Sequence, residues 1–154
     1  MPSLTINGKS LFYTIDEPSG PPKSTTLFIH GLGSSSCFYK AITPTLSSAT
    51  RCIALDTPGS GLSSIGTTEQ SIESIAKDAI GLLDALHFNE KVIVVGHSMG
   101  GIVASELAAS FPDRVKGVVL IGPVHPTPAL ADAFDKRIEA VKKGVSGLHH
   151  QSPS

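Results

Sequence analysis

The sequence predicts an α/β protein, a three-layer α/β/α sandwich around a mostly parallel sheet. A hairpin signal opens the chain, and strand-type and helix-type segments alternate after it. The later strand-type segments are apolar throughout, which is typical of parallel strands that helices cover on both faces. The clearest helix pattern, at residues 71–86, repeats apolar residues with i, i+3, i+4 and i+7 spacing.

Six strands are expected in chain order. Asn7-Gly8 is a strong signal for a two-residue hairpin turn between the first two strands. No strand-type segment follows residue 121, so we expect the sixth strand to be the last one in this chain. The six segments are residues 4–6, 11–15, 25–30, 51–55, 92–95 and 115–121.

Helices are expected between the strands, at residues 37–46, 71–86 and 98–110. Ser71 is a candidate N-cap for the second helix, and Pro112 stops the third.

The last predicted helix, at residues 127–143, has Thr127 as its N-cap, Pro128 at its first position and Gly144 as its C-terminal stop. We therefore expect one partial domain over residues 1–144, with core motifs at 25–122 and an irregular tail at 145–154.

Composition excludes several classes of protein. The 154 residues are 40% hydrophobic and 16% charged, as in a globular domain. A net charge of −1 without a basic patch argues against a nucleic-acid or anionic-lipid partner. No apolar run approaches the roughly 20 residues that span a bilayer, and the N-terminus has no signal-peptide core. With only Cys37 and Cys52, we expect a reducing, cytoplasmic location and no metal.

One motif carries the predicted chemistry. Residues 96–100, Gly-His-Ser-Met-Gly, fit G-x-S-x-G between an apolar strand and an apolar helix, the context that this motif requires. The turn is so sharp that side chains two residues before and after the serine would collide, so Gly96 and Gly100 are needed. The sequence therefore predicts Ser98 as a nucleophile, at a helix N-terminus whose free N–H groups face a developing oxyanion.

A second donor for an oxyanion hole is expected from residues 30–33, His-Gly-Leu-Gly. We expect the backbone N–H groups of Leu32 and Met99 to form this hole. Gly31 and Gly33 would let the loop approach a substrate carbonyl closely.

Three motifs in this order, HGLG at 30–33, DTPGSGLS at 56–63 and GHSMGG at 96–101, resemble the α/β-hydrolase superfamily. Within it, the chain is similar to small esterases and 3-oxoadipate enol-lactonase-like hydrolases over roughly residues 10–143. The resemblance implies hydrolysis of a small-molecule carboxylic ester or lactone through an acyl-serine intermediate, without a cofactor. It also implies that the helix at 127–143 begins a cap region. The chain would then be an N-terminal portion, with its sheet truncated after about the sixth strand.

The resemblance also indicates what is missing. In this family the triad runs serine, acid, histidine along the chain. After Ser98 the sequence offers no histidine with an acid placed to orient it, so we expect weak activity or none. A catalytically inactive binding or structural protein on the same fold is the alternative. The remaining candidates are His125, His149 and His150, without an acid to orient them, and Asp132 and Asp135 on an expected solvated face.

Three ionisable residues lie within the motifs but precede the position of a triad base. His30 comes before Ser98, so we expect it to shape the oxyanion loop. We call the sharp strand-to-helix turn at Ser98 the elbow, and we expect it to direct the side chain of His97 away from the substrate pocket. Asp56 is expected to stabilise its own turn.

Two other interpretations of the glycine-rich segments fail. Ser98 replaces the middle glycine of a dinucleotide-binding loop, and the strand after it ends without an acid for a ribose. Gly-Lys-Ser/Thr is absent, which excludes a P-loop.

The last predicted strand has an exposed edge. Residues 118–121, Val-Val-Leu-Ile, contain no charge and no proline. In the family's sheet another strand flanks this one, so we expect poor solubility or self-association through the edge.

Overall fold

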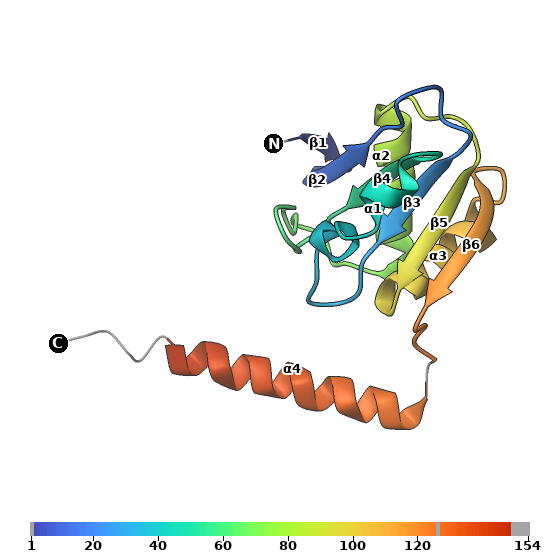
Figure 1. Cartoon of the computed structure of the whole chain (residues 1–154). Coiled ribbons are helices and arrows are strands. Elements are labelled where there is room, and N and C mark those ends of the chain that lie inside the picture. Colours follow the sequence, from blue (N-terminus) through green and yellow to red (C-terminus); the bar gives the residue numbers. More distant parts are fainter. Residues whose placement is uncertain (1, 126, 149–154) are drawn as a thin grey trace. The chain divides into compact units, whose positions relative to one another are not determined.

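The computed structural model describes residues 2–125 and 127–148. The chain divides into two compact units, Met1–Val124 and His125–Ser154. Figure 1 shows the sheet and helices of the first unit and the long helix of the second.

The first unit contains one six-stranded sheet with the order β1-β2-β4-β3-β5-β6. Neighbouring strands β4, β3, β5 and β6 are parallel, whereas β2 runs antiparallel to both β1 and β4. The sheet is therefore mostly parallel, as predicted. The strands are β1 (Ser3–Ile6), β2 (Lys9–Asp16), β3 (Thr25–Ile29), β4 (Arg51–Leu55), β5 (Val92–His97) and β6 (Val115–Ile121).

The predicted hairpin is confirmed. Asn7 and Gly8 have φ angles of 48° and 77°, and Ile6 pairs with Lys9 across the turn. A two-residue hairpin turn of this kind needs positive φ at both central positions, which asparagine and glycine tolerate best.

Helices cover both faces of the sheet (Figure 1), which confirms the three-layer arrangement. The 3-10 helix η1 (Ser36–Tyr39) and α1 (Thr43–Leu46) contact β3 and β4 from one side. On the other side lie α2 (Ile72–Ala85) and α3 (Met99–Ser110).

The continuous helix predicted at residues 37–46 is wrong, because η1 and α1 are two separate short helices. Pro44 lies at the start of α1 and has no N–H to donate to the carbonyl of Lys40. A proline also disfavours helical backbone at the residue before it, so it begins a helix more readily than it continues one.

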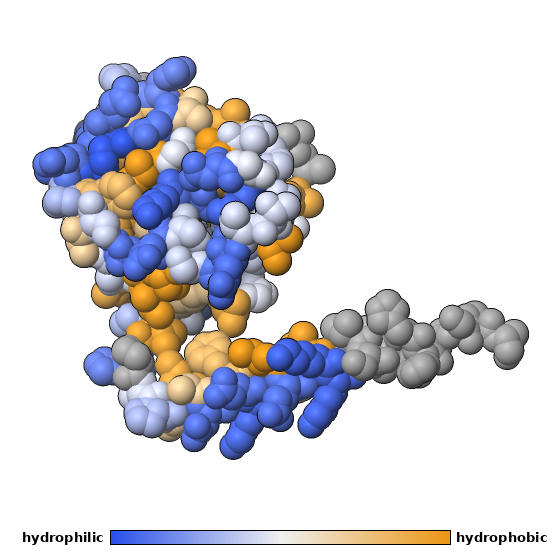
Figure 2. Space-filling view, turned by 180° about the vertical axis from the view of Figure 1, so that it is seen from behind, coloured by the Kyte–Doolittle hydropathy of each residue, from blue (hydrophilic) through white to orange (hydrophobic). Residues whose placement is uncertain are grey.

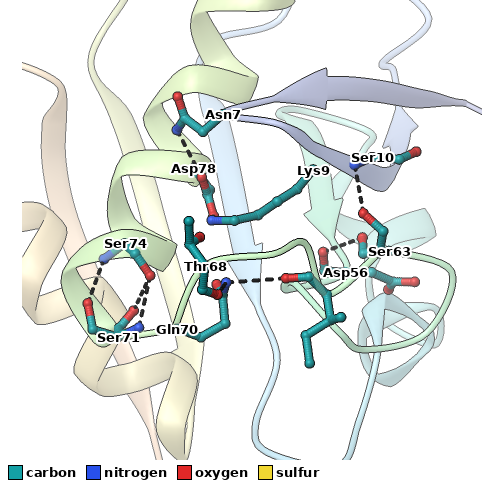
Figure 3. Close-up of polar contacts among 12 residues, drawn as sticks. Asn7, Lys9, Ser10, Asp56, Ser63, Thr68, Gln70, Ser71, Ser74 and Asp78 are labelled. Carbon is teal, nitrogen blue, oxygen red and sulfur yellow. Dashed lines mark hydrogen bonds and ion pairs between the residues drawn. The ribbon is translucent and has the colours of Figure 1, made fainter.

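Ser71 is the N-cap of α2, as predicted. Its side chain accepts a hydrogen bond from the N–H of Ser74 at 3.1 Å, and Ser74 Oγ accepts one from the N–H of Ser71 at 2.9 Å (Figure 3). This reciprocal capping box satisfies N–H groups that the first helical turn leaves free.

The hydrophobic core has a part on each face of the sheet. Strand β3 contributes to both, since Leu27 and Ile29 face α2 and α3, while Phe28 faces η1. The smaller part contains Phe28, Tyr39, Cys52, Ala54 and Val95.

A buried ion pair that the sequence analysis missed attaches the hairpin to α2. Lys9 Nζ lies 2.6 Å from Asp78 Oδ2, and both side chains are almost fully buried. Asn7 Nδ2 donates to the other carboxylate oxygen at 2.9 Å (Figure 3). The pair holds the edge of the sheet against the helix.

The second unit contains α4 (Pro128–Leu148). Its predicted N-cap is confirmed, since Thr127 Oγ1 accepts a hydrogen bond from the N–H of Leu130 at 3.2 Å. The predicted stop at Gly144 is wrong, because the helix continues to Leu148. A glycine inside a helix costs only about 1 kcal/mol relative to alanine, which favourable neighbours can offset.

The predicted irregular tail therefore overlaps the end of α4, and residues 149–154 lie outside the described residues. Figure 2 shows a hydrophobic strip along one side of α4 and a hydrophilic face along the other. Ile138 and Val141 on this helix are 50% and 65% exposed. No helix in residues 2–125 or 127–148 is both long and apolar enough to cross a membrane.

Candidate active site

The sheet has a topological switch point between β3 and β5. From β3 the chain passes through η1 and α1 to β4 on one side, whereas β5 lies on the other side of β3. In doubly wound sheets, ligands bind outside the carboxyl ends of strands at such a point. Ile29 pairs with Gly96, so the loop after β3 and the turn after β5 leave the sheet side by side.

Ser98 forms the turn at this place. Strand β5 ends at His97 and α3 begins at Met99, so one residue makes the whole connection. Its backbone has φ 52° and ψ −118°, and its N–H donates to the carbonyl of Ile121 at 3.0 Å. A non-glycine residue with positive φ stores roughly 1–3 kcal/mol of strain and is typical of functional sites.

The glycines on both sides of Ser98 allow this geometry. A Cβ on Gly96 would overlap the carbonyl oxygen of Gly100, and a Cβ on Gly100 would overlap that of Ile29. Gly101 is different, because a Cβ there would meet its nearest atom, Gly96 O, at 3.5 Å. Close packing of α3 therefore depends on Gly96 and Gly100 and not on Gly101.

The loop after β3 approaches the elbow closely. A Cβ on Gly31 would lie 3.1 Å from Ser98 Cβ and 3.0 Å from His97 Nδ1. Gly33 has a φ of 72°, which turns the loop back. In the described part of the chain, the N–H groups of Leu32 and Met99 donate no hydrogen bond. Both residues line one cavity of about 330 Å³ beside the elbow.

His30 is fully buried, and both of its ring nitrogens are engaged. The N–H of Thr57 donates to His30 Nε2 at 3.0 Å, and His30 Nδ1 lies 2.7 Å from the carbonyl oxygen of Gly31. Because Nε2 accepts, Nδ1 carries the proton and donates it to Gly31. The imidazole thus connects the loops after β3 and β4, which supports the expected structural role and not that of a base.

Asp56 is also buried and has both carboxylate oxygens occupied. Its Oδ1 accepts from the N–H of Ser36 at 2.6 Å, and its Oδ2 accepts from the N–H of Leu62 at 2.8 Å. A Cβ on Gly61 would overlap Oδ2, so glycine is required in this turn. These contacts support the expected role of Asp56 in holding its turn.

An aromatic cluster that the sequence analysis missed lies beneath the elbow. The ring of His97 stacks on Phe38, with centroids 4.4 Å apart and planes 20° apart. Tyr39 donates its hydroxyl to the carbonyl of Ile29 at 2.9 Å, and burial raises the pKa of Tyr39 to about 12. His97 therefore packs against η1. The Phe-Tyr pair a few residues after the HGLG loop was its only sequence signal.

No triad partner for Ser98 is found in the described part of the first unit, where Ser98 Oγ makes no hydrogen bond. His125, Asp132 and Asp135 belong to the second unit, and His149 and His150 lie outside the described residues. No group of three His, Cys, Asp or Glu side chains within residues 2–125 and 127–148 is placed to hold a metal ion.

The fold and this elbow define a hydrolase scaffold, and comparison with known proteins agrees. Residues 26–148 match the family model of the alpha/beta hydrolase fold. The chain therefore belongs to the α/β-hydrolase family, as its motifs indicated.

Several proteins that this chain resembles carry the names of hydrolases. The chain is 31% identical to a putative carbamate hydrolase, RutD, of a Caulobacter species, over 99% of this chain and 57% of that protein. The enol-lactonase of Burkholderia xenovorans superposes with a TM-score of 0.71 and 30% identity, over 76% and 45% of the two chains. A Pseudomonas aeruginosa hydrolase superposes with a TM-score of 0.81 and 26% identity, over 99% of this chain and 62% of that chain. The chain spans about half the length of these relatives.

Proposed function

We propose that this chain carries the nucleophile half of a serine hydrolase that acts on a carboxylic ester or lactone through an acyl-serine intermediate. The observation that carries the proposal is the strained, single-residue turn at Ser98, between β5 and α3. In the family's elbow this conformation presents Oγ at the carboxyl end of the sheet, and here Ser98 is half-buried beside the loop that carries Gly31.

The proposed reaction begins with attack of Ser98 Oγ on the substrate carbonyl carbon. The carbonyl oxygen gains negative charge, which the N–H groups of Leu32 and Met99 stabilise. The bond to the leaving oxygen then breaks, and water later hydrolyses the acyl-serine. The serine proton must pass to a base, and the described part of the first unit offers none to Ser98.

We therefore infer that the chain alone is weakly active. Catalysis without a triad in a serine protease is only about 10³–10⁴-fold over water. Among the described residues Ser98 Oγ has no hydrogen-bond partner, which also favours a second candidate, a catalytically inactive binding protein on the same fold. The cytoplasmic location stays a prediction.

Hydrolysis of p-nitrophenyl acetate tests this function. The purified chain should release p-nitrophenol feebly and gain an acetyl adduct on Ser98 that Ser98→Ala lacks. The residual rate itself should change little in Ser98→Ala, because catalysis without a base comes from the oxyanion hole and binding. Equal acetylation of the unmodified chain and Ser98→Ala would contradict the nucleophile. Full esterase-like turnover that is lost in His125→Ala would contradict the inference that Ser98 has no base.

A further inference from the structure

A separate cavity, of about 440 Å³, lies on the side of the sheet that η1 and α1 cover. These helices contact β3 and β4, and β2 is the next strand beyond β4. Residues of β2, η1, α1 and the turn after β4 line the cavity, whereas Ser98, Leu32 and Met99 do not. The cavity is therefore distinct from the proposed hydrolase site, and its size is that of a small-molecule pocket.

Strand β2 forms the floor of this cavity. Phe12, Thr14 and Asp16 alternate along the strand, so their side chains lie on the same face of the sheet. The N–H of Asp56 donates to the carbonyl of Phe12 at 3.0 Å, whereas Asp16 pairs with Cys52. The floor thus runs from an aromatic end, at the last residues of β4, to a charged end at its first residues.

The aromatic end presents hydrocarbon that the fold does not use. Phe12 is half-buried, yet it belongs to neither part of the hydrophobic core, and its ring pairs with no other ring among the described residues. Ala54 and Leu62 also line the cavity, and Leu62 is 56% exposed. Because covering such surface is favourable, this end suits an apolar or aromatic group.

Two opposite charges also line the cavity. Within the described part of the chain, the side chains of Asp16 and Lys40 make no hydrogen bond and no ion pair, not even with each other. Ser36 and Thr43 line the cavity as well, and each is only 5% exposed. Their hydroxyl groups have no hydrogen-bond partner among residues 2–125 and 127–148. Polar groups this buried are normally paired, so their capacity to bond remains for a ligand.

We propose that this cavity binds a small zwitterion with an apolar side chain, such as a free aromatic amino acid. Lys40 would take its carboxylate, Asp16 its ammonium group and Phe12 its side chain. A ligand with a single charge would leave one of the two charged residues without a partner, and charge-assisted hydrogen bonds are the stronger ones. This inference does not rest on the proposed function, because it uses none of the residues assigned to hydrolysis.

Cys37 reports occupancy of the cavity, since it lines the cavity and its thiol is exposed. The measurement is the ligand concentration that halves the rate at which Ellman's reagent modifies this thiol. The ligands are L-phenylalanine, 3-phenylpropanoate, which lacks the ammonium group, and 2-phenylethylamine, which lacks the carboxylate. L-Phenylalanine should protect at a concentration on the order of millimolar, as expected for so small a ligand. Each analogue should need about tenfold more, because it loses one bond between charged groups.

Substitution of each charge should affect the three ligands differently. Lys40→Met should weaken protection by L-phenylalanine and 3-phenylpropanoate about tenfold and leave 2-phenylethylamine unchanged. Asp16→Asn should weaken protection by L-phenylalanine and 2-phenylethylamine and leave 3-phenylpropanoate unchanged. The matched controls are Lys23→Met and Asp113→Asn, at exposed residues that do not line the cavity, and they should change none of the three concentrations.

Three results would overturn the inference. One is the absence of protection by L-phenylalanine at tens of millimolar. Another is equal protection by L-phenylalanine and either analogue, which would show that one of the two charges is not recognised. The third is a half-protecting concentration of L-phenylalanine that is the same in Lys40→Met and Lys23→Met. A change in the intrinsic reactivity of Cys37 does not disturb this comparison, because each variant is measured against its own rate without ligand.

Discussion

Gly100 lies so close to the carbonyl oxygen of Ile29 that a Cβ on this glycine would overlap that oxygen. The contact joins the first turn of α3 to the end of β3. It therefore connects the element that carries the proposed nucleophile to the loop that carries the proposed oxyanion donor.

Alanine at Gly100 should consequently destabilise the fold. We expect Gly100→Ala to lower the free energy of unfolding by about 1–3 kcal/mol or more, because β3 or α3 must shift. Gly101→Ala is the matched control, since its added Cβ would have 3.5 Å of room and alanine favours a helix. If urea unfolding showed that both variants lose the same amount of unfolding free energy, the close packing of Gly100 at the elbow would be contradicted.

Much of the fold and of the turn at Ser98 could be predicted from the local sequence. Strands at residues 51–55 and 115–121 have the predicted bounds, because each is a short, largely apolar segment between turn residues. Gly96 and Gly100 could be assigned roles because G-x-S-x-G has one known geometry.

The structure differs from the predictions where a single residue, or a contact between residues far apart in the sequence, determines the local conformation. Pro44 divides a predicted helix by lacking an N–H, and Gly144 does not stop α4 although glycine often ends helices. The Lys9–Asp78 pair joins residues 69 positions apart, so no local pattern reports it. The stacking of His97 on Phe38 likewise depends on how the β3 loop meets the elbow.

The buried Lys9–Asp78 pair gives a second prediction. Asp78→Ala should destabilise the protein by about 3–5 kcal/mol, because it leaves an uncompensated buried ammonium group. The double variant Lys9→Met, Asp78→Leu should recover most of that loss. The exposed pair of Lys143 and Glu139 is the control, and Glu139→Gln should change stability by less than about 0.5 kcal/mol. Similar losses in Asp78→Ala and Glu139→Gln would refute the structural role of the buried pair.

The two cysteines should differ in reactivity. Cys37 is exposed, whereas Cys52 is buried. Burial, with a smaller contribution from Asp16, raises the pKa of the Cys52 thiol to about 11. Ellman's reagent should therefore modify one thiol quickly in the native protein, and Cys37→Ser should abolish that phase. Two equally fast thiols in the native state would show that Cys52 is accessible.

The same raised pKa predicts a loss of stability in alkali. Between the ordinary thiol pKa of 9.0 and about 11, the unfolded chain loses the Cys52 proton and the folded chain keeps it. Stability is thus intact below pH 9.0 and falls with rising pH, by about 1.4 kcal/mol per pH unit for one group. Cys52→Ala should flatten the decline of unfolding free energy over this window. An unchanged slope would contradict the burial of this thiol.

Strand β6 lies at an edge of the sheet, and its residues Val119 and Leu120 are 48% and 44% exposed. We expect the chain to self-associate through this edge, since unpaired backbone groups on an apolar strand can pair with a second copy. Val119→Lys should lower the molar mass measured by light scattering towards that of the monomer. Ile65→Lys, at a loop residue that is 65% exposed, should not. A monomer at tens of micromolar for the unmodified chain would disprove this expectation.

Covalent labelling by a fluorophosphonate tests the central claim most directly, because it reports the nucleophile without requiring turnover. Intact mass spectrometry of the labelled chain should show one adduct, and peptide mapping should place it on Ser98. Ser98→Ala should carry no adduct, whereas Ser105→Ala, on the same helix, should be labelled like the unmodified chain. Equal labelling of the unmodified chain and Ser98→Ala would contradict the assignment of Ser98 as the nucleophile.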